Sequence, residues 1–257
     1  TFVFAAAQDN TIERFAVESG ERIPFVGHES WARGLAFSPQ GDTFYSGGNE
    51  GRLIAWPTAE ASPAPARTVE AHQGWVRAVA VSPDGTLVAT AGNDHFVRLW
   101  SAQEGTLIRE LAGHESHVYN LAFHPSGTHL VSGDLKGVIR QWEVASGSEV
   151  RQLDASRLWK YDSGFAADIG GVRAIAFNTE GTLLACGGIT DVSNAFAGVG
   201  NPAVVLFDWE SGTPKLVHLS KEGLQGVVWG LAFHPDGFLI GATGGGGGGS
   251  LLFWRPD

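Results

Sequence analysis

The chain has 257 residues, a formal net charge of −10 and a single cysteine. This acidity argues against a nucleic-acid partner, because phosphate binding requires a basic surface. No apolar run approaches the roughly 18 residues that a membrane helix needs, so we expect no membrane insertion. Cys186 lies in a strand-like apolar stretch without a second cysteine, and we expect a buried, inert thiol there.

Residues 1–28 form the first element in chain order. They alternate like three strands, so we expect a partial copy of a repeat that becomes clear further along the chain. The chain begins without a methionine and shows no signal peptide. We therefore expect the natural N-terminus to lie upstream, and we favour a soluble protein of the cytoplasm.

Five similar segments follow, each an apolar-alternating strand that ends in a turn rich in Pro, Asp and Gly. They begin near residues 31, 75, 117, 171 and 227. Further strands follow each turn, but the last copy stops after its third strand. The pattern predicts a single domain over residues 1–257, with four complete four-stranded sheets between two three-stranded ones.

These copies resemble WD40 repeats, which carry Gly-His near the start and Trp-Asp at the end. The resemblance implies an all-β, WD40-type β-propeller of four-stranded antiparallel blades. Bare sheet edges at both ends would be sticky, so we expect a longer, seven-bladed intact protein, with a six-bladed one as the alternative. The regular, glycine-rich copies are most similar to those of bacterial WD40 proteins.

The resemblance also implies a structural tetrad in each blade, made of a His, a Ser or Thr of strand b, an Asp of the b–c turn and the Trp of strand c. The matching residues are His28, Ser46, Glu50 and Trp56 in one copy, His72, Thr90, Asp94 and Trp100 in the next, and His114, Ser132 and Trp142 in the third. In the third copy Lys136 replaces the Asp, so we expect a broken network or one rerouted through Asp134. With one such His per blade, we expect no metal site.

Two columns near the start of strand a carry residue types that are common at binding hot spots. They are Arg33, Arg77, Tyr119, Arg173 and Trp229, and, two positions earlier, Trp31, Trp75 and His117. In the family, these positions lie at the mouth of the central channel on the face called top, where the d–a and b–c loops open. The alternative is that the Trp residues pack between blades and the Arg residues pair with turn carboxylates.

Three irregular segments are expected on the same face, at 154–170, 189–202 and 244–249. The first carries Arg157, Trp159, Tyr161 and Phe165, and the second carries Asn194 and Phe196. The first two flank one blade and are expected to touch. For the glycine run we expect a flexible hairpin, with an anion-binding nest as the alternative.

No catalytic motif is present in the sequence. We expect a non-catalytic protein-interaction scaffold, without cofactor or metal, that binds a peptide or protein partner on the top face. The alternative is a propeller that binds a small ligand or carbohydrate, or one attached to an enzymatic or electron-transfer domain in a longer chain. No feature of the sequence indicates an oligomeric state.

Overall fold

The computed structural model describes residues 1–7, 9–194, 199–220, 224–245 and 248–256. Over these ranges the chain forms antiparallel strands and one 3-10 turn, η1 (Ser156–Leu158). It divides into two compact units, Thr1–Val118 and Tyr119–Asp257. Each unit has apolar cores of its own.

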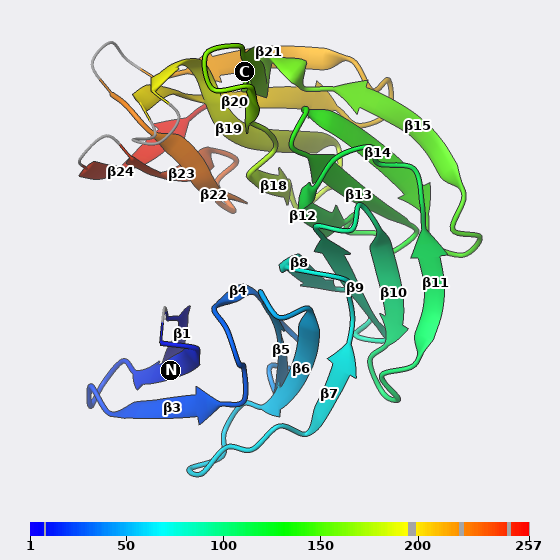
Figure 1. The fold of residues 1–257 in the computed structure, drawn as a ribbon, viewed down its shortest axis with the longest axis vertical. Helices are drawn as coiled ribbons and strands as arrows, with labels where there is room; N and C mark the ends of the chain where they lie inside the picture. Colours follow the sequence, from blue (N-terminus) through cyan, green and yellow to red (C-terminus); the bar gives the residue numbers. More distant parts are fainter. Residues whose placement is uncertain (8, 195–198, 221–223, 246–247, 257) are drawn as a thin grey trace. The chain divides into compact units, whose positions relative to one another are not determined.

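The first unit contains three sheets, and each follows the chain order as a meander (Figure 1). The first sheet has three strands: β1 (Phe2–Ala6), β2 (Thr11–Ala16) and β3 (Arg22–Val26). The second has four: β4 (Ala32–Phe37), β5 (Thr43–Gly48), β6 (Arg52–Pro57) and β7 (Arg67–Glu70). The third also has four: β8 (Val76–Val81), β9 (Leu87–Gly92), β10 (Val97–Ser101) and β11 (Leu107–Leu111).

The second unit repeats this meander. Its first sheet contains β12 (Val118–Phe123), β13 (His129–Asp134), β14 (Val138–Glu143) and β15 (Glu149–Asp154). A separate hairpin follows, made of β16 (Trp159–Asp162) and β17 (Ala167–Gly170). The next sheet contains β18 (Ala174–Phe177), β19 (Leu183–Asn194), β20 (Val199–Asp208) and β21 (Pro214–Leu219). The last contains β22 (Val227–Phe233), β23 (Leu239–Gly245) and β24 (Gly248–Trp254).

The predicted arrangement of four complete blades and two three-stranded blades is confirmed within the described residues. Six blades match the six-bladed alternative. The seven-bladed form of a longer chain and the single domain over 1–257 stay predictions.

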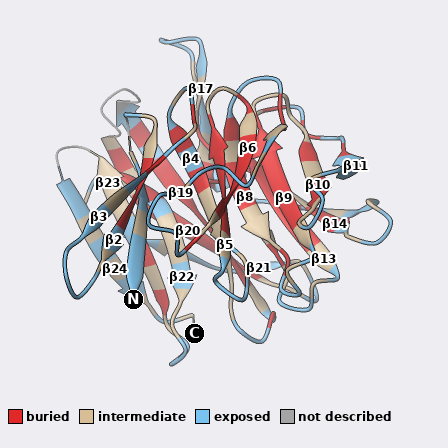
Figure 2. Ribbon diagram, turned by 90° about the horizontal axis from the view of Figure 1, so that it is seen from below, coloured by how far each residue is buried: buried red, intermediate tan, exposed pale blue. Residues whose placement is uncertain are grey.

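In the four-stranded blades, most residues of the central strands are buried (Figure 2). In the first unit, the Phe25 ring lies edge-on to Phe44 at 5.1 Å and to Trp56 at 5.6 Å between ring centres. In the second unit, Cys186 is fully buried beside Phe207, and this burial raises the pKa of its thiol well above the usual range.

Arginine side chains connect neighbouring blades within each unit. Arg67 of β7 donates from Nη1 to the carbonyl oxygen of Ala102 at 3.2 Å and from Nη2 to that of Gln103, in the turn after β10. Arg151 of β15 donates in the same way to the carbonyl oxygens of Trp209 and, at 2.9 Å, Glu210, in the turn after β20. Each guanidinium therefore ties the outer strand of one blade to the c–d turn of the next.

Two segments expected to be irregular are in fact strands. Residues 159–170 form the hairpin β16–β17, in which Trp159 pairs with Gly170 and Asp162 with Ala167. Residues 189–194 and 199–202 extend β19 and β20, so that Ile189 pairs with Pro202. Backbone pairing satisfies the donors and acceptors that an irregular loop of this length would leave to solvent.

Candidate partner-binding site

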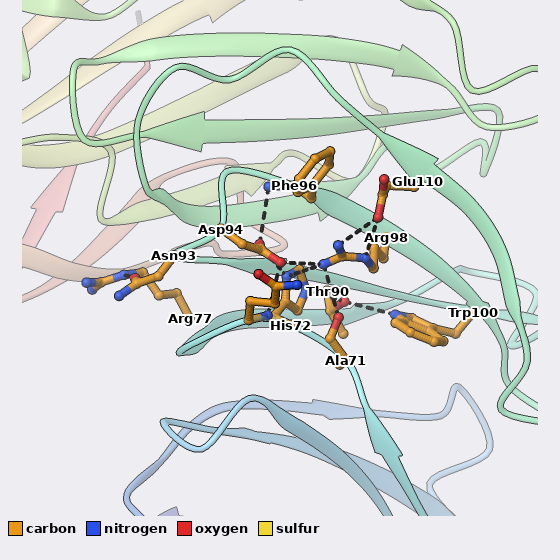
Figure 3. Close-up of polar contacts among 11 residues, drawn as sticks. Ala71, His72, Arg77, Thr90, Asn93, Asp94, Phe96, Arg98, Trp100 and Glu110 are labelled. Carbon is orange, nitrogen blue, oxygen red and sulfur yellow. Dashed lines mark hydrogen bonds and ion pairs between the residues drawn. The ribbon is translucent and has the colours of Figure 1, made fainter.

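The tetrad of the third blade is a continuous chain of hydrogen bonds (Figure 3). Trp100 Nε1 donates to Thr90 Oγ1 at 2.9 Å, Thr90 Oγ1 lies 2.8 Å from His72 Nε2, and His72 Nδ1 lies 2.7 Å from Asp94. This order assigns the proton of a neutral imidazole to Nδ1 and lets the Thr90 hydroxyl donate to Nε2. Burial lowers the pKa of His72, which keeps the ring neutral.

The second blade has the same geometry with a glutamate in place of the aspartate. Trp56 Nε1 donates to Ser46 Oγ at 2.8 Å, and Ser46 Oγ lies 2.6 Å from His28 Nε2. His28 Nδ1 makes a short contact with Glu50. The longer side chain therefore reaches the same ring nitrogen as the aspartate of the next blade.

The fourth blade has the same Trp–Ser hydrogen bond as the second and third. Trp142 Nε1 donates to Ser132 Oγ at 2.8 Å, and His114 is buried. Asp134 occupies the position that Gly48 and Gly92 hold in the other two blades. A Cβ at either glycine would lie 2.5 Å from Nδ1 of the tetrad histidine in the same blade. Asp134 caps the turn, accepting from the Lys136 and Val138 amides at 2.9 and 3.0 Å.

In the first unit, the strand-a columns form a ladder of Trp31, Arg33, Trp75 and Arg77 on two adjacent blades. The Arg33 guanidinium carbon lies 5.9 Å from the Trp31 ring centre and 4.6 Å from that of Trp75. The Arg77 guanidinium lies 4.8 Å from the same Trp75 ring. Both residues are partly open to solvent, 43% exposed at Trp31 and 36% at Trp75.

Two β-bulges set the direction of the Arg33 and Arg77 side chains. The pairing of strand a with strand b shifts register between Ala32 and Gly34, and again between Val76 and Ala78. Arg33 and Arg77 are therefore the extra residues of two β-bulges. A bulge leaves its extra residue out of the ladder of backbone hydrogen bonds and redirects its side chain, which is a recurrent device beside binding sites.

Two asparagines hold the arginines in place. Arg33 Nε donates to Asn49 Oδ1 at 2.8 Å, and Arg77 Nε donates to Asn93 Oδ1. These acceptors are neutral amides in the turns between strands b and c. Neither asparagine is predicted from the sequence, although each follows its arginine by the same 16 residues and this repeat was the available signal.

The second unit has its own cluster, built from Tyr119, Arg173 and Trp229. The Arg173 guanidinium lies 3.8 Å from the Tyr119 ring centre and 5.6 Å from that of Trp229, while its Nε donates to the Gly170 carbonyl oxygen at 2.7 Å. Trp229 is 56% exposed and sits at another register shift, between Val228 and Gly230. Its indole Nε1 donates to the Gly244 carbonyl oxygen at 3.1 Å.

The hairpin β16–β17 contacts the extended β19 beside this cluster. Lys160 Nζ donates to the Val192 carbonyl oxygen at 3.0 Å, and Ile169 packs against Ile189, Val192 and Val227. Trp159 is held by a 2.9 Å hydrogen bond from Nε1 to Asp168. The two segments expected to touch therefore do so.

Apart from Phe196, the remaining predicted site residues lie on the hairpin, in η1, at the end of β19 and just before β12. Tyr161 and Phe165 are more than half exposed on the hairpin, and Arg157 is exposed in η1. Asn194 ends β19 opposite Val199, and Phe196 lies outside the described residues. The His117 ring centre is 5.4 Å from that of His95, and burial, together with Arg77 and His95, lowers the pKa of His117.

The sheets are antiparallel meanders of three or four strands, and the second and third blades carry a His–hydroxyl–Trp network. These features place the chain in the β-propeller class of proteins. The family model for the WD domain, G-beta repeat, matches residues 21–56, 63–101 and 105–143. The chain therefore contains three WD40 repeats. A search of curated proteins finds no match.

The structure also bears on two further expectations. Among the described residues, no helix has the length and apolar character needed to cross a membrane. In the same part of the chain, no three His, Cys, Asp or Glu side chains gather in a way that could hold a metal ion.

Proposed function

We propose that this chain is a non-catalytic protein-interaction scaffold that binds a peptide or protein partner through the strand-a residues and adjoining top-face loops. WD40 propellers commonly act as interaction scaffolds and are typically non-catalytic. The observation that carries the proposal is the set of exposed tryptophans beside arginines, at Trp31, Trp75 and Trp229. Exposed Trp and Arg are the residue types that dominate binding energy at interfaces.

Exposed tryptophans leave part of their free energy of burial unrealised. Full burial of a large apolar side chain is worth roughly 1.5–3 kcal/mol, and a partly exposed indole forgoes a share of this energy. Trp31 and Trp75 recur at equivalent strand positions, and Trp229 stands at the position that Arg33 and Arg77 hold in their strands. Packing against neighbouring blades, the alternative interpretation, does not account for their exposure. A partner that covers these rings would gain this energy.

The test is partner capture with matched variants. Photo-crosslinking of the intact chain in a cell lysate, followed by mass spectrometry, should identify a partner that is lost in Trp229→Ala and Arg77→Ala. The controls are Leu107→Ala and Val150→Ala, exposed apolar residues on the outer strands β11 and β15. The proposal fails if capture is unchanged in the first pair, or if their melting temperatures fall enough to explain the loss.

A second candidate, binding of a small polar ligand such as a sugar, is favoured by one cavity. A groove of about 600 Å³ lies between the outer strand of the fourth blade and the turns of the fifth, with Trp209, His124 and Glu180 among its lining residues. Aromatic rings beside carboxylates can hold sugars by stacking and hydrogen bonds. A glycan array separates the candidates, because it should show binding lost in Glu180→Gln only if the groove is the site.

A further inference from the structure

We infer that the ladder of Trp31, Arg33, Trp75 and Arg77 binds an acidic peptide segment through the carboxylates of its side chains. This rests on the proposed function and adds the chemistry of the partner. The inference starts from the way Arg33 is held, which differs from that of Arg52 and Arg98 in the same unit.

Two arginines of the neighbouring strands, Arg52 and Arg98, are neutralised by carboxylates. Arg52 bonds Glu29 and Glu70 at 2.6 and 2.7 Å, and Arg98 bonds Asp94 and Glu110, both at 2.7 Å. Arg33 is exposed and makes no ion pair with any described residue; its Nε is fixed by the neutral Asn49 amide. An amide sets the orientation of a guanidinium without cancelling its charge.

The free edge of Arg33 suits a carboxylate. With Nε bonded to Asn49, neither Nη atom of Arg33 has a hydrogen-bond partner among the described residues. A planar guanidinium held by an amide and an aromatic ring is preorganised, so little side-chain entropy is lost when a carboxylate binds its two Nη groups. Asn93 fixes Arg77 through the same Nε contact, which places a second cation near the same Trp75 ring.

Charge complementarity selects the occupant. Although the chain as a whole carries a net charge of −10, the Arg33 guanidinium is a local positive site, and it attracts a carboxylate at short range. Polyphosphates require a broad basic surface, and here Arg52 and Arg98 are already paired with carboxylates. Exposed indoles between the arginines favour a peptide, whose apolar side chains can cover the rings while its carboxylates meet the guanidinium groups.

The experiment measures binding of a fluorescein-labelled peptide of alternating glutamate and serine to the full chain by fluorescence anisotropy. The reference peptide has glutamine in place of glutamate. We expect the glutamate peptide to bind at least about tenfold more tightly, because hydrogen bonds to charged groups are each worth this much or more. Binding should weaken as salt rises, since the contacts lie at the surface.

Three variants locate the site. Arg33→Gln should weaken binding of the glutamate peptide by about tenfold or more. Asn49→Asp should weaken it similarly, because the new carboxylate pairs with Arg33 and cancels its charge. Arg52→Gln removes the same charge at a guanidinium that is already paired, so it should leave the affinity within about twofold. Melting temperatures establish that each variant is folded, and Arg33→Lys replaces Arg33→Gln if the latter does not fold, with a smaller expected loss.

Three results would overturn the inference: equal affinity for the glutamate and glutamine peptides, an equal loss in Arg52→Gln, or tighter binding of a single-stranded oligothymidylate of matched charge. Failure here is distinct from failure of the proposed function. If crosslinked partner capture still depends on Trp229 and Arg77 while the glutamate peptide does not bind, the scaffold function stands and only the acidic chemistry is wrong.

Discussion

His72 shows how one buried polar residue organises a blade. Its two ring nitrogens are satisfied by Thr90 and Asp94, and Trp100 completes the chain through the same Thr90 hydroxyl. Asp94 also accepts from Arg98 and from the Gln73 amide. Because every link depends on its neighbour, a network of this kind costs most when a single member is removed.

Thr90→Val tests this dependence. The valine keeps the shape of the side chain but leaves the Trp100 indole N–H and His72 Nε2 without their shared partner. We expect the free energy of unfolding, measured by urea denaturation, to fall by about 2–3 kcal/mol. Thr86→Val removes an exposed turn hydroxyl and should change stability by no more than about 0.5 kcal/mol. Equal effects in the two variants would contradict a special role for the network.

The same residues predict how stability depends on pH. Burial lowers the pKa of His72 below its ordinary 6.5, so the unfolded chain binds a proton there that the folded chain excludes. Stability should therefore decline as the pH falls from about 6.5 toward the folded pKa. Burial alone would raise the pKa of Asp94, but hydrogen bonds from His72 and Arg98 bring it well below 3.8, so a second decline begins below that pH.

Urea midpoints between pH 8 and 3 check both declines. In a His72→Gln variant, which carries no titratable group at this position, the decline that begins near pH 6.5 should be smaller than in the parent chain. A parent chain whose midpoint is constant from pH 7 to pH 5 would show that the His72 pKa is not lowered by folding.

At the scale of elements, arginine ties hold the blades together. Arg151 donates to two carbonyl oxygens of the next blade and also, through Nε, to Gln141 at 2.6 Å. Its guanidinium lies 5.3 Å from the Trp209 ring centre. Gly105 and Gly212 leave room for these ties, because a Cβ at either would lie within 3 Å of the arginine it faces.

Arg151→Ala should therefore destabilise the second unit. It leaves two carbonyl oxygens and the buried Gln141 amide without a donor, so we expect a loss of about 2–3 kcal/mol in the free energy of unfolding. Lys215→Ala, on an exposed position of β21, is the charge-matched control and should lose less than about 0.5 kcal/mol. The idea of an inter-blade tie is wrong if the two variants have the same urea midpoint.

The elements were predicted from the sequence where a local pattern sets them. Alternating apolar residues and Gly-containing turns locate the blade strands because each strand buries its faces against adjacent blades. The bulges at Arg33 and Arg77 leave no such trace, since the extra residue is polar and does not alter the apolar pattern. The hairpin around Trp159 and the extension of β19 were also missed, because their pairing depends on backbone hydrogen bonds and on packing of Ile169 against Val192.

At the scale of the whole molecule, the chain is predicted to be one domain, although its contacts divide it into two units. A single domain should unfold in one cooperative transition. Cys186, the chain's only cysteine, is buried in the second unit and reports on that unit alone.

We expect the urea midpoint for alkylation of Cys186 to coincide with the midpoint from far-ultraviolet circular dichroism, which reports on both units. Labelling should be slow in native buffer, since burial raises the pKa of the thiol and little thiolate forms. Labelling that begins at clearly lower urea would show that the second unit unfolds separately.

The arginine ties have a consequence for how such a chain can grow. Their acceptors are backbone carbonyls, and the accepting residues differ between the receiving turns: Ala102 and Gln103 in one, Trp209 and Glu210 in the other. A duplicated gene segment that encodes one blade would thus bring its own arginine and would require only the turn glycine of its neighbour. Copies could then diverge at the other turn positions while the joints between them are preserved.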